Sequence, residues 1–171
     1  MILVGVVRAK NTRSVMDNNN AVVAIDARRG VDYIGITCPF YCYDSQGRLL
    51  LHKRSNKCRD EVGNWDCGGG SMEFGESFEE AATREIKEEY GTTPKQLKLC
   101  GITNMVRDNN GAKTHWVAAV FAVEVDPMDV KIMEPEKVDD WGWFYPDNLP
   151  SPLHSCLLKN LNVVKQSGIK L

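Results

Sequence analysis

Residues 84–91 read Arg-Glu-Ile-Lys-Glu-Glu-Tyr-Gly and place three carboxylates within little more than one helical turn. Like charges one turn apart destabilise a helix by about a few tenths of a kcal/mol per pair. The surroundings add to the repulsion, because residues 73–89 contain seven glutamates but only one arginine and one lysine. This segment therefore requires a positive partner that the local sequence does not supply.

The same residues belong to a helix with two marked ends. Ser77 and Glu80 have the spacing of a capping box, in which each side chain bonds the other residue's backbone N–H. Gly91 supplies the residue type that adopts the left-handed conformation after a helix. The pattern predicts a helix over residues 78–90.

A helical wheel of this segment places carboxylates beside its apolar stripe of Phe78, Ala82 and Ile86. Glu85 and Glu89 fall in or beside the stripe, and Glu88 lies at its edge. Burial of an unpaired carboxylate costs several kcal/mol, which disfavours a plain surface helix. The alternative is a tilted helix whose glutamates are solvated, as most charge runs are.

Three consecutive glycines lie upstream of the helix. Gly68, Gly69 and Gly70 let the backbone approach a ligand closely. A glycine loop followed by carboxylates at i, i+3 and i+4 can enclose a hard cation with oxygen ligands. Mg²⁺ fits such a site because it keeps several waters and takes few carboxylates together with substrate phosphates. Mg²⁺ is therefore the expected cofactor, with Mn²⁺ as a possible substitute.

Gly70, Glu76 and the run 84–91, at their observed spacing, resemble the Nudix box of the Nudix hydrolases. The box ends at Thr92 where a bulky aliphatic residue is usual, and Gly68 stands where a proline often precedes the two glycines. Neither departure removes an expected metal ligand. The resemblance implies an α/β (α+β) Nudix fold, in which a mixed β-sheet is sandwiched between helices.

The rest of the chain is compatible with that fold. Asp44–Gly47 and Asp108–Gly111 carry turn signals between apolar segments, and the Asn-Gly pair in the second is a strong hairpin signal. An apolar stripe at helical spacing predicts a second helix within residues 151–168. Strands are predicted over residues 34–44, 47–55, 97–107, 114–125 and 139–146.

The chain is expected to divide into an N-terminal extension, residues 1–33, and a Nudix hydrolase domain, residues 34–171. The extension can form a hairpin across the polar loop 11–20 or contribute to a homodimer, and periodicity does not choose between them. Every site residue predicted here lies downstream of residue 33. Removal of residues 1–30 is therefore expected to spare the chemistry.

The resemblance implies Mg²⁺-assisted attack of water on a phosphorus of a nucleoside diphosphate linked to another group. Glu85, Glu88 and Glu89 are then metal ligands or orienters, with the Gly70 carbonyl as a further ligand. One of the glutamates can also be the base, so Glu88 and Glu89 are counted as catalytic. Arg84, one turn before Glu88, is expected to hold that carboxylate in place.

A second acid or base is expected on the loop after residue 130, where Glu134 and Glu136 are candidates. By the same resemblance Arg54 is expected to contact substrate phosphates, and Gly69 is a further candidate for substrate binding. Phe40 and Trp116 are candidates for stacking a base or sugar, although such aromatics are more often core residues.

The substrate prediction is a (d)NTP, converted to a monophosphate and pyrophosphate, because residues 114–121 and 133–144 are similar to Nudix triphosphate pyrophosphatases. An ADP-ribose or NDP-sugar pyrophosphatase is the alternative. No Pro lies between Pro94 and Pro127, and no Tyr between Tyr90 and Tyr145, so markers of two other subclasses are missing. A non-catalytic nucleotide-binding module and a prenyl-diphosphate isomerase using Cys67 are further alternatives.

Composition excludes several other classes. A formal net charge of -2 does not favour binding to a nucleic-acid polymer. No apolar run approaches the ~18 residues of a membrane-spanning helix, and no cleavable leader is recognised. The six cysteines form no CxxC pair and are expected to be reduced, so a soluble, cytoplasmic protein is predicted.

Overall fold

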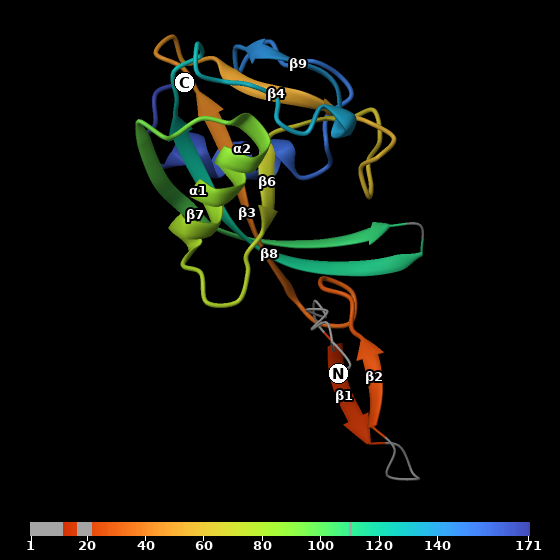
Figure 1. The fold of residues 1–171 in the computed structure, drawn as a ribbon. Helices are drawn as coiled ribbons and strands as arrows, with labels where there is room; N and C mark the ends of the chain where they lie inside the picture. Colours follow the sequence, from red (N-terminus) through yellow and green to blue (C-terminus); the bar gives the residue numbers. More distant parts are fainter. Residues whose placement is uncertain (1–11, 17–21, 110) are drawn as a thin grey trace, which may run out of the picture.

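The computed structural model describes residues 12–16, 22–109 and 111–171. Its centre is a mixed seven-stranded sheet with the order β5-β4-β3-β8-β7, in which β6 also pairs with β3 and β9 with β4 (Figure 1). Among the strand pairs of the described residues, only β3–β8 is parallel. The strands are β3 Gly35–Tyr43, β4 Leu49–Arg54, β5 Trp65–Asp66, β6 Gly68–Ser71, β7 Gln96–Asn109, β8 Ala112–Glu124 and β9 Val138–Phe144.

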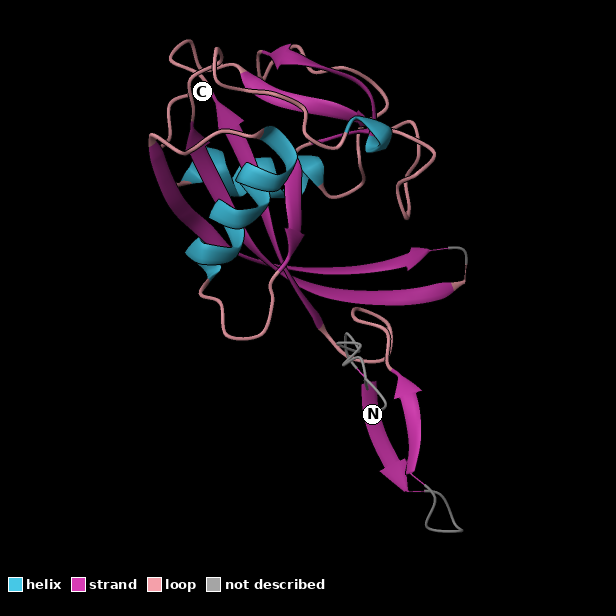
Figure 2. Ribbon diagram, viewed as in Figure 1, coloured by secondary structure: helices cyan, strands magenta, loops and turns pink. Residues whose placement is uncertain are grey.

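Two helices cover opposite faces of this sheet, as Figure 2 shows, so the predicted mixed α+β fold is confirmed. Helix α1 is Phe78–Tyr90 and helix α2 is Leu157–Gln166. Side chains alternate along the central strand β8 because successive residues point to opposite faces. Ala119, Phe121 and Val123 pack with α1, whereas Ala118, Val120 and Ala122 pack with α2.

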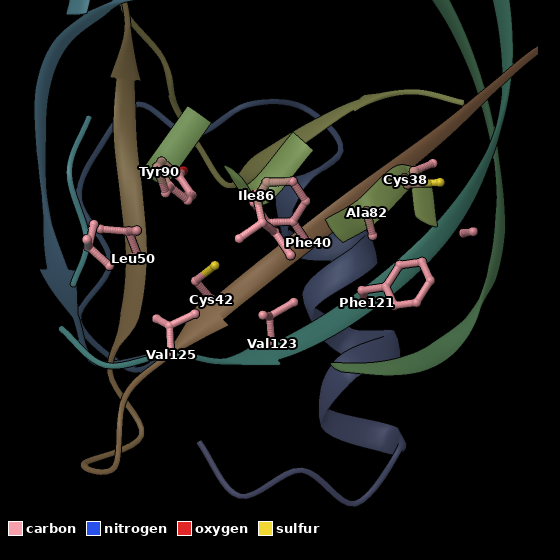
Figure 3. Close-up of a cluster of buried hydrophobic side chains, with 13 residues drawn as sticks. Cys38, Phe40, Cys42, Leu50, Ala82, Ile86, Tyr90, Phe121, Val123 and Val125 are labelled. Carbon is pink, nitrogen blue, oxygen red and sulfur yellow. The ribbon is translucent and has the colours of Figure 1, made fainter. Parts of the chain in front are cut away.

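Helix α1 has the predicted bounds and caps. The Ser77 hydroxyl accepts from the Glu80 N–H at 3.2 Å, and the Glu80 carboxylate accepts from the Ser77 N–H at 2.8 Å. Gly91 has φ 60° and ends the helix. The apolar face packs Ala82 and Ile86 into the core shown in Figure 3.

Helix α2 is shorter than the predicted segment 151–168. Residues before Cys156 are not helical because they pair with β5 instead. The Trp65 N–H donates to the Pro152 carbonyl at 2.8 Å, and the His154 N–H donates to the Trp65 carbonyl at 2.8 Å. Leu158 of this helix is 52% exposed, whereas Leu157 and Leu161 are buried.

The predicted strands are present with bounds that differ by a few residues, and β6 was not predicted. The glycine segment was expected to be a loop, but Gly68–Ser71 pairs with Thr37–Phe40 of β3. Gly47, at φ 75°, closes the predicted turn through a 3.0 Å hydrogen bond to the Asp44 carbonyl. All six cysteines are free, as predicted.

The N-terminal segment includes a separate antiparallel pair, β1 Thr12–Met16 with β2 Val22–Asp26. Strand β1 lies within the polar stretch that sequence patterning favoured as a loop, and residues 1–10 lie outside the described residues. Figure 1 shows this pair beyond the N-terminal end of β3. In the part of the chain described here, no helix has the length and apolar character needed to cross a membrane.

Candidate active site

Helix α1 presents two carboxylates to strand β6. Glu85 lies against Gly70, where an added Cβ would overlap with the Glu85 carboxylate. Glu89, one turn later, accepts a 3.2 Å hydrogen bond from the Gly69 N–H. A glycine is therefore required at position 70 because the Glu85 carboxylate occupies the space that a side chain would fill, whereas a side chain at position 69 would meet the backbone of β3.

Arg84 holds the neighbouring carboxylates with its whole guanidinium group. It donates to Glu76 at 2.7 Å, to Glu85 at 2.7 Å and to Glu88 at 3.1 Å. A further bond of 3.1 Å reaches the Ser71 carbonyl. One planar, always charged side chain thus fixes the helix to the segment that follows β6.

The carboxylates of Glu89 and Glu85 both have raised pKa values. Burial raises the pKa of Glu89 well above its ordinary value, and the nearby charge of Glu85 adds to this. Burial also raises the pKa of Glu85, although its bond from Arg84 opposes the shift. A cation at this position would relieve the cost of keeping both groups ionised.

The donor set fits a Mg²⁺ ion that retains waters. Glu85, Glu89 and the Gly70 carbonyl could supply hard oxygen ligands, and the carbonyl already accepts from the Thr37 hydroxyl at 2.9 Å. Within the described residues no three Asp, Glu, His or Cys side chains converge closely enough to form a complete cage. Mg²⁺ usually takes one or two carboxylates with waters and substrate phosphates, so this set is sufficient.

A hollow extends from this edge toward the loop before β9, and we call it the box hollow. Glu134 lines it together with the helix carboxylates, and its side chain is paired with Lys137 at 2.7 Å. Glu136 is exposed and does not line the hollow, although its carbonyl accepts from Ser55 at 2.6 Å. Of the two loop candidates, the structure brings only Glu134 to the site.

A second hollow, the Trp116 pocket, opens on the α2 face of the sheet. It shares Gly69, Gly70, Ser71 and Glu89 with the box hollow. Its walls include Trp116, Met105 and the buried amide of Asn160. Phe40 does not line it, because that ring is fully buried and packs edge-on against Tyr90 with centroids 5.8 Å apart (Figure 3).

Arg54 and Arg59 both line the Trp116 pocket, and they differ in their partners. Arg54 lines the Trp116 pocket, yet its guanidinium is paired with Asp60 at 2.8 Å and Asp66 at 3.4 Å. Arg59 is exposed and its guanidinium carbon lies 5.2 Å from the Trp116 ring centroid. Arg59 was missed because no local pattern distinguishes it from the other charges of residues 53–61.

A polar network holds the outer wall of the Trp116 pocket and was also missed. Arg107 pairs with Asp60 at 3.0 Å and with Glu61 at 2.8 Å. Glu61, with φ 49°, accepts from the Ser155 N–H at 2.8 Å and from its hydroxyl at 2.6 Å. These contacts join segments 46 and 94 residues apart in sequence, which periodicity cannot reveal.

Comparison with known proteins agrees with this geometry. The NUDIX domain family model matches residues 36–161. A nucleoside triphosphatase NudI from Escherichia coli is 32% identical over 124 residues, which cover 67% of this chain and 83% of the relative. An ADP-ribose pyrophosphatase from Methanocaldococcus jannaschii is 35% identical over 108 residues, or 63% of this chain and 60% of the relative.

A MutT NUDIX hydrolase from Burkholderia pseudomallei is similar in structure, with a TM-score of 0.68 and 32% identity, covering 77% of this chain and 98% of that one. The aligned part of this chain spans only about 60% of the length of the archaeal relative. The name of that protein therefore does not by itself show the activity of this chain. The family model covers well over half of the chain and includes every box residue. This chain therefore belongs to the Nudix family and is an enzyme of the Nudix hydrolase type.

Proposed function

We propose that this protein is a Mg²⁺-dependent pyrophosphohydrolase that converts a (d)NTP to a nucleoside monophosphate and pyrophosphate. The observation that carries the proposal is the junction of two hollows at Gly69 and Gly70. One hollow holds acidic oxygen ligands, and the other offers Trp116 and a buried amide, Asn160. A nucleotide has the same two parts, a metal-binding phosphate chain and a flat base.

In this proposal the metal ligands and Arg84 have different roles. Glu85, Glu89 and the Gly70 carbonyl would hold Mg²⁺, which supplies neutralisation of phosphate oxygens and activation of a bound water. Arg84 keeps Glu85 and Glu88 oriented through its bonds of 2.7 Å and 3.1 Å. Positioning of this kind matters because displacement of a reacting group by ~1 Å can reduce the rate by roughly 10²-fold.

Hydrolysis forms a bond between the water oxygen and phosphorus and breaks the bridging phosphorus–oxygen bond. After attack at the α-phosphorus pyrophosphate leaves with the bridging oxygen, and after attack at the β-phosphorus the monophosphate leaves with it. In both cases the water proton passes to a carboxylate. Glu89 and Glu134 face the box hollow from the helix and from the opposite loop, and they are the two groups we propose as proton acceptors. Arg59, over the Trp116 ring, is placed to contact the phosphate nearest the nucleoside.

Hydrolysis of ADP-ribose or an NDP-sugar is the second candidate. It is favoured by the named activity of the archaeal relative, which has the higher identity of the two curated relatives described. The same box would act on the pyrophosphate of either substrate class. An isomerase using Cys67 is disfavoured, because burial raises the pKa of that thiol well above its ordinary value.

A substrate panel with Mg²⁺ tests the proposal. Purified protein is supplied with the eight common NTPs and dNTPs, ADP-ribose and several NDP-sugars, and products are separated by ion-exchange chromatography. We expect the highest kcat/KM for a triphosphate, with monophosphate and pyrophosphate in equal amounts. A clear preference for ADP-ribose or an NDP-sugar would make the second candidate correct.

A further inference from the structure

Arg29 reaches the box hollow from outside the region that the family model matches. The model begins at residue 36, whereas Arg29 lines the same hollow as Glu85, Glu88 and Glu134. Its Nη1 donates to the Met72 carbonyl at 2.9 Å, directly after strand β6. The N-terminal segment thus contributes a cation beside the proposed metal ligands.

Among the described residues, the cations of the box hollow differ in whether a carboxylate pairs with them. The hollow has two other cations in the described part of the chain, and both are committed. Arg84 binds Glu76, Glu85 and Glu88, and Lys137 binds Glu134. Arg29 has no ion pair within 4.0 Å among the residues that the structure describes, and it bonds only a neutral carbonyl.

The residue after Arg29 fixes this segment to the substrate side of the site. Gly30 has φ 79°, and an added Cβ would overlap with the Trp116 indole. Its carbonyl accepts from the His115 N–H at 2.8 Å, and its N–H donates to the Tyr33 carbonyl at 2.8 Å. Arg29 is therefore carried by backbone that packs against one wall of the Trp116 pocket.

From this geometry we propose that Arg29 binds the phosphate chain of the substrate, beside the proposed metal ligands of the box hollow. An arginine that bonds one carbonyl keeps further N–H donors, and its planar fork suits phosphate oxygens. The inference rests on the proposed function, since it takes a polyphosphate as the occupant of the hollow. It differs from the expectation that every site residue lies downstream of residue 33.

Arg28 provides a matched control. It is the preceding arginine, its side chain is 68% exposed, and it pairs with Asp32 at 3.1 Å. It does not line the box hollow. Replacement of either arginine removes one positive charge from the same segment. A difference in pyrophosphate binding between the two variants therefore reports the position of Arg29 in the box hollow.

The test measures binding of inorganic pyrophosphate to the full-length protein in the presence of Mg²⁺ by isothermal titration calorimetry. Arg29→Gln keeps an N–H donor for the Met72 carbonyl but removes the charge. We expect it to weaken pyrophosphate binding by roughly 10-fold and to reduce the salt dependence of binding, because charge-assisted bonds to phosphate are the strong ones. Arg28→Gln should remain within about twofold of wild type by the same reasoning.

Melting temperature and steady-state kinetics separate binding from structure. We expect Arg29→Gln to melt close to wild type and to raise KM for the best substrate more than it lowers kcat. Equal pyrophosphate affinity in the two variants would overturn the inference. Tighter Mg²⁺ binding in Arg29→Gln with unchanged pyrophosphate affinity would also overturn the inference. Arg29 would then only offset the negative charge of the glutamates in the box hollow.

Pyrophosphate binding also keeps this inference distinct from the proposed function. If no triphosphate is hydrolysed but Arg29→Gln still weakens pyrophosphate binding, the inference stands and the proposed substrate is wrong. If triphosphates are hydrolysed and Arg29→Gln binds pyrophosphate as wild type does, the proposed substrate stands and the inference fails.

Discussion

The Glu85 carboxylate occupies the space that a side chain on Gly70 would need. The two residues come from helix α1 and strand β6, which pack together beneath the box hollow. This contact explains why a glycine is required at a position that is not in the left-handed region of backbone conformation. The requirement is one of space for a carboxylate, not of backbone freedom.

Gly70→Ala should therefore displace Glu85 while leaving the backbone of β6 in an accessible conformation. We expect activity to fall by roughly 10²-fold and the Mg²⁺ concentration for half-maximal rate to rise, because a misplaced ligand affects both. The measurement is a Mg²⁺ titration of the hydrolysis rate. In a Glu85→Gln background the same change should cost little more, and full additivity of the two losses would contradict the direct contact.

Glu89→Gln should change the pH dependence of stability. Because burial raises the pKa of Glu89, the folded protein binds this proton more tightly than the unfolded chain does. Metal-free wild type should lose stability as pH rises above the ordinary glutamate range, and Glu89→Gln should lose less. Thermal melts from pH 5 to pH 8 without metal test this expectation.

Mg²⁺ gives a second readout on the same pair of proteins. Binding to the folded state should raise the melting temperature of wild type with increasing Mg²⁺, and more so at higher pH, where the carboxylates are ionised more readily. Glu89→Gln should show a much smaller rise. Identical metal-dependent shifts in the two proteins would remove Glu89 from the metal site.

Glu134→Gln and Glu136→Gln form a matched pair on one loop. Of these two, only Glu134 lines the box hollow, so its replacement should lower kcat by roughly 10²-fold, the lower end of the range for loss of an acid–base group. Glu136→Gln should stay within about twofold, as exposed charges generally do. Equal kcat values for the two variants would argue against a role for Glu134 in proton transfer.

Glu61 should support stability at neutral pH but not in acid. Burial opposes ionisation, yet hydrogen bonds from the Ser155 hydroxyl and N–H prevail and lower the pKa of Glu61 to about 2. Its contribution is present above the ordinary value of 4.5 and is lost as pH falls from there toward 2. Glu61→Gln should thus destabilise by about 1–2 kcal/mol at pH 7 and much less near pH 2.5. Urea unfolding at both pH values measures the difference, and an equal loss at both would refute the assignment.

Sequence alone predicts the parts of this fold that depend on local patterns. Helix α1 has the predicted bounds because Ser77, Glu80 and Gly91 specify its ends through bonds within a few residues. The alternation in β8 likewise follows from burial on both faces. The start of α2 could not be predicted, since residues 152–154 pair with Trp65, which lies far away in sequence.

The candidate site also has one part that local sequence predicts and another part that it does not. The carboxylates of α1 and the glycines of β6 are close in sequence, and their spacing was enough to predict that they meet. Arg29, Arg59 and the Glu61–Ser155 contact depend on how distant segments pack. Phe40 is an example of the opposite kind. Strand patterning does not decide which face of β3 its ring occupies, and in the structure the ring is fully buried in the core.

The most direct test of the account is the identity of the products formed from a triphosphate by wild-type protein in ¹⁸O-labelled water, with and without Mg²⁺. The account predicts metal-dependent release of pyrophosphate and a monophosphate, with ¹⁸O in one of these two products. No orthophosphate is expected as a primary product. The position of the label then identifies which phosphorus is attacked. Release of orthophosphate with a nucleoside diphosphate, or equal turnover after removal of the metal by EDTA, would contradict it.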